Sequence, residues 1–310
     1  MTAPTTAPPR VLREREWQAL EAAHQAQVDA WTTGHLDRRR RREKHPVEDF
    51  LFTYYSHRPA QLRRWHPGAG VVLLGDAALE RLGWRFYTEV DAGAAGSGVA
   101  VDVAGFLAER GATVDFVTGL LAATASRPAQ LGCFGLHEWA MVYRLREGEQ
   151  RHEDWPLRLE PAGTDAVVEA HPVRCTHFDA FRFFTEPARP LNAHQPTREA
   201  QVALEQPGCL HATMDLYKWT SKLVPALPSS LIAACFQLAR DAREVDMRAS
   251  PYDLRSLGVS PIHVETAAGR AEYVRLQRDL AIRGQRLRSA IVRLCRPLTA
   301  SRSRRRSGGQ

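Results

Sequence analysis

The sequence lacks the patterns that define several large protein classes. No apolar run reaches the roughly 18 residues that a transmembrane helix needs, and the N-terminal MTAPTTAPPR contains no apolar signal-peptide core. The five cysteines are an odd number, stand far apart and form no C-x-x-C pair, which argues against a disulfide framework and a zinc ribbon. These absences predict a protein of the reducing cytoplasm that has no membrane partner.

Several standard catalytic motifs are also absent. The sequence contains neither G-x-S-x-G nor H-E-x-x-H. Gly93, Gly96 and Gly98 do not fit G-x-G-x-x-G, and no Lys-Ser or Lys-Thr pair follows them. We therefore expect the glycine-rich segment 91–103 to be a flexible loop and not a phosphate-binding loop.

The excess of positive charge is confined to two short segments. The chain has 310 residues, with 42 Lys and Arg against 35 Asp and Glu, which gives a formal net charge of +7. Residues 37–44 and 301–310 each carry a net charge of +4, so the rest of the protein has a net charge of −1. Such segments are typical of electrostatic tethers or solvated ends, whereas a broad nucleic-acid surface would spread its basic residues over one face.

The hydrophobic pattern predicts a mainly α protein with a few short β-strands in its N-terminal half. We expect one globular domain over 12–295, between a disordered lead at 1–11 and a basic disordered tail at 296–310, and a boundary near 147–166 is left open. Apolar residues at three- and four-residue spacing predict helices. The expected helices span 12–36, 106–124, 197–206, 210–223, 229–247 and 266–294, and the expected strands span 71–75 and 84–91.

Four histidines stand close to a carboxylate in segments rich in aromatic residues. At i,i+4 on a helix the two side chains share one face, where a carboxylate can orient an imidazole for acid–base chemistry or both can bind one metal ion. Buried polar groups need partners, so we expect at least two of these pairs to meet in one site. The pairs are His45 with Asp49, His137 with Glu138, His177 with Asp179, and His211 with Asp215.

Two further segments carry chemically useful side chains. Basic and aromatic residues alternate over 54–66 and 217–219, a pattern that suits phosphate contacts combined with base stacking, although a helix with an aromatic core side gives the same pattern. The acidic segment 240–247 contains Asp241, Glu244 and Asp246. Paired carboxylates can do acid–base work, and a solvated salt-bridge face is the alternative.

Four stretches of the chain resemble an actinobacterial protein family usually labelled 3-methyladenine DNA glycosylase. They are HPVEDFLFTYYSHRPAQLRRWHPG, FGLHEWAMVYR, CLHATMDLYKW and DMRASPYDL, and the resemblance extends over about 12–295. It implies a DNA-repair enzyme that hydrolyses the N-glycosidic bond of an alkylated purine flipped out of the duplex, with DNA as its partner and no cofactor. The resemblance assigns no catalytic residue.

Three hypotheses for the function follow. As a glycosylase, the protein would use Asp215 or Asp49 as its carboxylate, with His211 and His45 beside them. Stacking residues would then be Tyr55, Trp65, Tyr217 and Trp219, and phosphate contacts Arg58, Arg63, Arg64 and Lys218. As a metal-dependent hydrolytic or oxidative helical enzyme, it would bind Fe, Mn or Zn through the His–acid set: His45, Asp49, His137, Glu138, His177, Asp179, His211 and Asp215.

The third hypothesis is a nucleic-acid-binding protein without catalytic activity. It predicts binding that depends steeply on salt and on the arginine-rich segments, and that does not need the His–acid pairs. The sequence leaves the oligomeric state open.

Overall fold

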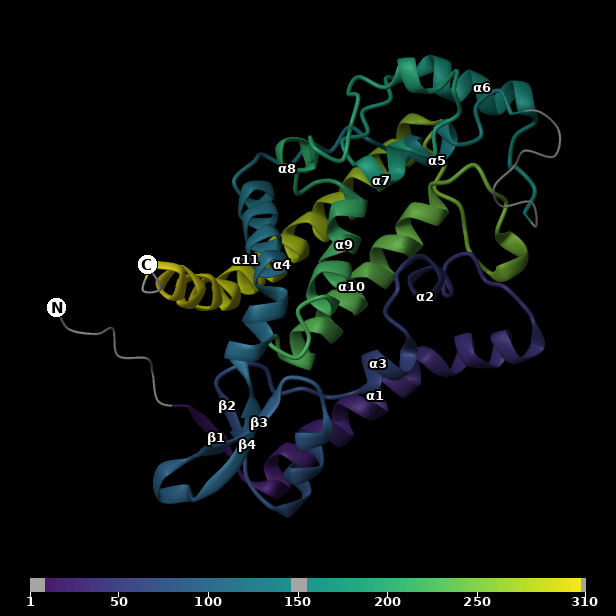
Figure 1. Cartoon of the computed structure of the whole chain (residues 1–310). Coiled ribbons are helices and arrows are strands. Elements are labelled where there is room, and N and C mark those ends of the chain that lie inside the picture. Colours follow the sequence, from purple (N-terminus) through teal and green to yellow (C-terminus); the bar gives the residue numbers. More distant parts are fainter. Residues whose placement is uncertain (1–8, 146–154, 308–310) are drawn as a thin grey trace.

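The computed structural model describes residues 9–145 and 155–307 and is mainly helical, as the sequence predicts. Its central helices are α4 (Val103–Ala125), α9 (Leu210–Ser221), α10 (Ser229–Arg248) and α11 (Ala267–Ser307). Figure 1 shows α9 and α10 side by side in the middle of the molecule, with α4 and α11 close to them. No helix among the described residues is long and apolar enough to cross a membrane.

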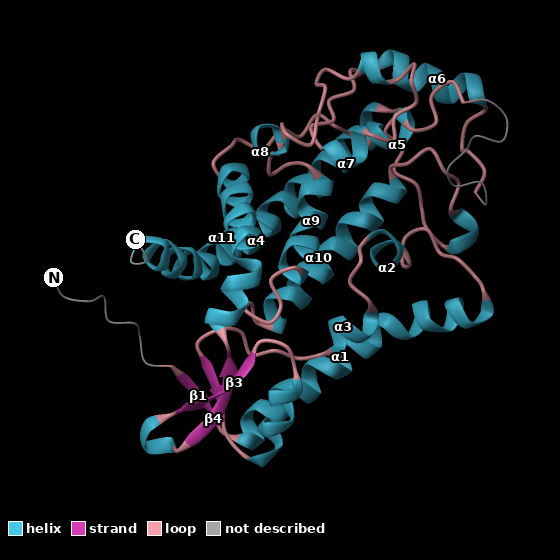
Figure 2. Cartoon of the chain, viewed as in Figure 1, coloured by secondary structure: helices cyan, strands magenta, loops and turns pink. Residues whose placement is uncertain are grey.

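A small four-stranded sheet lies at one end of the helical body (Figure 2). Its strands are β1 (Arg10–Leu12), β2 (Val71–Leu73), β3 (Tyr87–Asp91) and β4 (Ser97–Val101), in the order β1-β2-β4-β3. β1 and β2 are parallel, and the other two pairings are antiparallel. The two predicted strands are therefore present, but the glycine-rich segment predicted to be a loop contains β4. Gly98 is needed there, because a Cβ atom would lie 2.8 Å from the carbonyl oxygen of Leu73.

The helices α4, α9, α10 and α11 contribute most of the main hydrophobic core. One face of α10 is buried in this core: Cys235, Leu238, Ala242 and Val245 are each at most 7% exposed. α9 is buried almost throughout, which places the polar residues of this helix inside the protein. Polar side chains in such a place must find partners within the protein.

Further helices and turns surround this core. α1 (Glu14–Arg41) crosses it on one side and is followed by α2 (Phe50–Tyr54) and α3 (Pro59–Arg63). On the opposite side lie α5 (Leu136–Ala140), α6 (Pro161–Ala170), α7 (Phe178–Phe181) and α8 (Gln201–Leu204). The short 3₁₀ turns are Asp76–Gly83, Gly93–Ala95, Arg189–Leu191 and Arg255–Leu257.

Both chain ends are more structured than the sequence predicts. Arg10 and Val11 of the expected lead belong to β1, and α11 continues to Ser307 through most of the expected tail. Residues 1–8 of the lead lie outside the described residues, as do 308–310. Part of the open boundary at 147–166 falls in the undescribed segment 146–154, and α6 begins at Pro161.

Candidate functional site

Three of the four predicted histidines meet in the interior. His137 lies on α5, His177 immediately precedes α7, and His211 lies in the first turn of α9. The ring of His211 is 4.5 Å from that of His137 and 5.3 Å from that of His177, measured between centroids. All three side chains are buried. Three of the histidines that the sequence singled out therefore lie close together, although their partners differ from the predicted ones.

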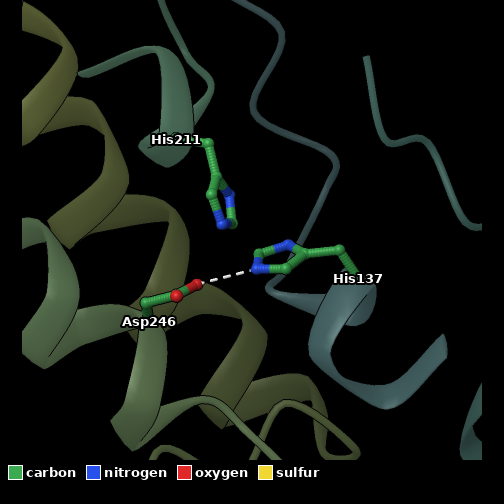
Figure 3. Close-up of side chains that lie close together, drawn as sticks. All are labelled: His137, His211 and Asp246. Carbon is green, nitrogen blue, oxygen red and sulfur yellow. Dashed lines mark ion pairs between the residues drawn. The ribbon is translucent and has the colours of Figure 1, made fainter. Parts of the chain in front are cut away.

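The first group of possible metal ligands joins His137 and His211 to Asp246 of α10 (Figure 3). One donor atom from each residue lies within 4.8 Å of the other two. The Nε2 atom of His137 is 2.8 Å from Oδ1 of Asp246, so the two buried side chains form an ion pair. In Figure 3 the rings of His137 and His211 both point toward the space beside the Asp246 carboxylate.

The electrostatics of this group are those of a buried ion pair with a neutral neighbour. Burial lowers the pKa of His137, but the Asp246 carboxylate outweighs burial and raises it well above its ordinary value. Burial likewise raises the pKa of Asp246, and His137 outweighs it, so this pKa is lowered. Burial and the positive charge of His137 lower the pKa of His211 well below its usual value. His211 is thus a neutral imidazole at neutral pH, the form that binds metals.

Further residues hold the first group in place. The Arg243 guanidinium donates from Nη1 to Oδ2 of Asp246, at 2.9 Å, and to Oε1 of Glu138, at 3.0 Å. The other ring nitrogen of His137, Nδ1, lies 3.6 Å from Sγ of Cys133. Contacts of this kind fix the orientation of metal-binding side chains in known sites.

The second group consists of His177, Glu205 and Asp215, and it already contains a cation. Nε2 of His177 is 3.3 Å from Oδ2 of Asp215 and 3.7 Å from Oε1 of Glu205. The Lys218 ammonium donates to Asp215 at 2.9 Å, and the Tyr55 hydroxyl donates to the other oxygen of the same carboxylate at 2.9 Å. Each group thus includes a basic side chain, since Lys218 pairs with Asp215 here and Arg243 pairs with Asp246 in the first group.

A cavity of about 180 Å³ reaches the first group from α2 and α7. His211, Arg243 and Glu138 line its polar part, and Phe50 and Tyr54 line its apolar part. The Arg243 guanidinium lies 3.9 Å above the centre of the Phe50 ring. A small molecule in this cavity would therefore contact the His211 end of the first group.

The predicted partners of the histidines differ from those in the structure. His211 and Asp215 belong to different groups, and Asp215 contacts His177. Glu138 pairs with Arg243 and not with His137, while Asp179 accepts from Lys218 at 2.8 Å. These differences have one cause: spacing along the chain describes one helix, whereas the contacts here join different elements.

His45 and Asp49 lie away from the three histidines. The Asp49 carboxylate is bound by Arg38 at 2.7 Å and lies 2.9 Å from Nδ1 of His35, so it ties α1 to the turn before α2. The Asp49 carboxylate contacts His45 through the backbone of that residue: the N–H of His45 donates to Oδ2 of Asp49 at 2.8 Å. The i,i+4 spacing here forms a structural turn, and Arg38 of the basic segment is part of it.

The residues predicted to contact DNA occupy different environments. The four predicted stacking residues are at most 7% exposed: Tyr55, Trp65, Tyr217 and Trp219. Arg58, Arg63 and Arg64 are exposed, and Arg63 donates to Asp29 at 2.7 Å. Lys218 bridges Asp179 and Asp215, next to the histidines. Their roles in DNA binding stay predictions.

Three important residues were not predicted as site residues: Asp246, Arg243 and Glu205. Asp246 and Arg243 do lie in the acidic segment 240–247, and their three-residue spacing on α10 was a usable signal. Glu205 follows α8 and has no such pattern around it.

Comparison with known proteins finds no match to this chain. No known family model matches the chain, and neither a curated protein nor a solved structure matches it.

Proposed function

We propose that this protein is a metal-dependent enzyme whose ion is bound by His137, His211 and Asp246. One observation carries the proposal: donor atoms from α5, α9 and α10 converge in the interior beside a cavity. Two histidines and one carboxylate are a recurrent ligand set of catalytic zinc and non-haem iron sites.

A bound metal ion would replace the proton between His137 and Asp246. Nε2 of His137 and Oδ1 of Asp246 are buried and 2.8 Å apart. Metal binding releases the proton of a ligating imidazole, so both atoms would then coordinate the same cation. His211 supplies the third ligand from the cavity side, which leaves that side open for water or substrate, as in catalytic sites.

The ligand set supports hydrolytic and oxidative chemistry. A bound Zn²⁺ would lower the pKa of a water molecule and activate it for hydrolysis, whereas Fe or Mn would support oxidation. Within the protein, Arg243 would orient the Asp246 carboxylate and Cys133 would contact the His137 ring.

The five cysteines are free thiols, and we propose the reducing cytoplasm as the location of the protein.

Elemental analysis of the purified protein tests the proposal. We expect about one equivalent of Fe, Mn or Zn in the full-length protein, and loss of it in His211→Gln and Asp246→Asn. His263→Gln, which changes an exposed histidine, is the matched control and should retain the ion. His177→Gln should also retain it, since His177 belongs to the second group. A protein that binds no ion after reconstitution, or that binds it equally well in His211→Gln, would rule the site out.

The second candidate function is hydrolysis of the N-glycosidic bond of alkylated purines in DNA. The cavity supports it, because aromatic rings of Phe50 and Tyr54 lie there together with the carboxylates of Glu138 and Asp179. A flipped base needs such stacking surfaces, and its cleavage needs an acidic group.

Release of 3-methyladenine from alkylated DNA tests this second function. We expect release by the wild type after metal removal, and loss of release in Glu138→Gln or Asp179→Asn, the two carboxylates of the cavity. No release by the wild type, at any metal content, would end this candidate and leave the metal-dependent one intact.

A further inference from the structure

A basic hollow of about 360 Å³ lies on the surface near the sheet, and none of His137, His177 and His211 lines it. It is formed by the end of α3, the turn that precedes β3, the N-terminal half of α4 and the C-terminal end of α9. Four cationic side chains line it, and no carboxylate does: Arg64, Arg85, Arg110 and Lys222. We call this feature the basic hollow.

The cations of the basic hollow are poorly neutralised by the protein itself. Arg85 pairs with Glu109, which is not part of the lining. Within residues 9–145 and 155–307, Arg64, Arg110 and Lys222 have no ion pair with a carboxylate. Charges of one sign that gather around one space repel each other and attract a counter-ion of opposite sign.

Neutral hydrogen-bonding groups complete the lining. The Oε1 atom of Gln61 accepts from the backbone of Arg58, so the Gln61 amide nitrogen keeps its two protons for another partner. His57 also lines the hollow, where burial lowers its pKa to about 4. Its ring is therefore neutral at neutral pH and can donate one hydrogen bond. Binding sites for small anions combine charged and neutral donors in this way.

We propose that the basic hollow binds the phosphate groups of a small phosphorylated molecule. Three guanidinium groups and one ammonium group match a ligand with several negative oxygens, because guanidinium forks pair with phosphate through two hydrogen bonds at once. The volume lies in the range of small-molecule sites. The Trp84 ring contacts the guanidinium groups of Arg64 and Arg81, at 4.8 and 4.5 Å, so it is badly placed to stack a nucleic-acid base.

Calorimetric titration of the full-length protein with inorganic pyrophosphate tests this proposal. The variant Arg110→Gln/Lys222→Gln removes two exposed cations without ion pairs, so the fold should not suffer. We expect its affinity to fall by about tenfold or more. The control Arg275→Gln/Arg278→Gln makes the same change of charge on exposed residues of α11 that do not line the hollow, and its affinity should equal that of the wild type. Absence of saturable binding, or equal loss in both double variants, overturns the proposal.

Two further titrations separate this site from its neighbours. Pyrophosphate can also bind a metal ion, so the titration is repeated on chelator-treated protein, and binding that persists there supports a site independent of the proposed metal. Binding that disappears on chelation but survives in Arg110→Gln/Lys222→Gln contradicts the basic hollow. In the second titration a short single-stranded oligonucleotide competes with pyrophosphate. Displacement of pyrophosphate means that the phosphate groups of a phosphodiester backbone also bind in the basic hollow. An oligonucleotide that binds while pyrophosphate does not overturns the small-molecule site.

Discussion

Arg243 is a fully buried cation that joins two carboxylates beside the histidines. Its side chain is 1% exposed and contacts Glu138 and Asp246. Removing one member of a buried charge network leaves the other charges without compensation, which costs far more than the network contributes as a whole. The residue therefore matters for stability whatever reaction the protein performs.

We expect Arg243→Met to lower the free energy of unfolding by about 3–5 kcal/mol. Urea denaturation followed by circular dichroism measures the change. Arg278→Met, on the exposed side of α11, should stay within about 0.5 kcal/mol of the wild type. Adding Glu138→Gln to Arg243→Met should recover part of the loss, since one unpaired carboxylate disappears. A loss below 1 kcal/mol in the single variant would contradict this account of the network.

Glu265 provides a pH-dependent contribution to stability. Burial raises the pKa of this carboxyl, but hydrogen bonds from Arg158 and its surroundings outweigh burial and bring it to about 2. The two Arg158–Glu265 contacts are 2.8 and 3.1 Å. Because the folded pKa lies below the ordinary value of 4.5, the contribution is complete above about pH 4.5 and disappears as the pH falls toward 2.

We therefore expect Glu265→Gln to be less stable than the wild type by about 1–2 kcal/mol at pH 7, after allowance for solvent screening. The difference should shrink below pH 4.5 and vanish near pH 2. Unfolding curves at several pH values follow it, with Glu186→Gln, an exposed carboxylate, as the control. A difference that stays constant from pH 7 to pH 3 would show that the Arg158 pair is not its source.

At the scale of elements, close backbone contact fixes where α11 begins. A Cβ atom on Gly269 would lie 1.9 Å from the carbonyl oxygen of His263, which is backbone and cannot rotate away. Gly119, on an exposed position of α4, has nothing within 4 Å of the corresponding point. Substitution by alanine should thus have opposite effects on stability at these two glycines.

Gly269→Ala should destabilise the protein by roughly 2–4 kcal/mol, because the start of α11 must move away from His263. Gly119→Ala should instead stabilise it by up to about 1 kcal/mol, since alanine is the better helix former. Thermal denaturation of both variants checks the signs. An equal change in stability in both variants would mean that helix propensity, and not the backbone contact at Gly269, determines the effect of alanine.

The helices that could be predicted from the sequence are those with a continuous apolar face. The predictions for 210–223 and 229–247 agree with α9 and α10 to within two residues, because their packing repeats the helical period. β4 was missed because its glycines carry no strand pattern, and Gly98 is explained only by its contact with β2. The last turns of α11 were missed because arginine-rich sequence predicts a solvated tail.

For the candidate site, the sequence predicted the histidines better than their partners. His137, His177 and His211 stood out because they lie in aromatic segments, and burial is what brings them together. Their partners depend on how α5, α7, α9 and α10 pack, which local spacing does not describe. Asp246 is 35 residues from His211 in the chain, yet their donor atoms lie within 4.8 Å of each other.

At the scale of the whole molecule, the proposed ion would join segments that are distant in the chain. His137, His211 and Asp246 come from three helices on both sides of the undescribed segment 146–154. A ligand that binds only the folded state stabilises all of it, by an amount set by the ratio of its concentration to its dissociation constant. Metal binding should consequently appear as a change in global unfolding.

We expect a metal concentration of 100 times the dissociation constant to raise the free energy of unfolding by about 2.7 kcal/mol. The measurement compares the thermal midpoint of chelator-treated protein before and after addition of Zn, Fe or Mn. His211→Gln has its own stability, so the quantity compared is the increment caused by the metal, which should vanish in this variant and persist in His263→Gln. An equal increment in His211→Gln would place the binding elsewhere on the protein, because exposed histidines and carboxylates also bind these metals weakly.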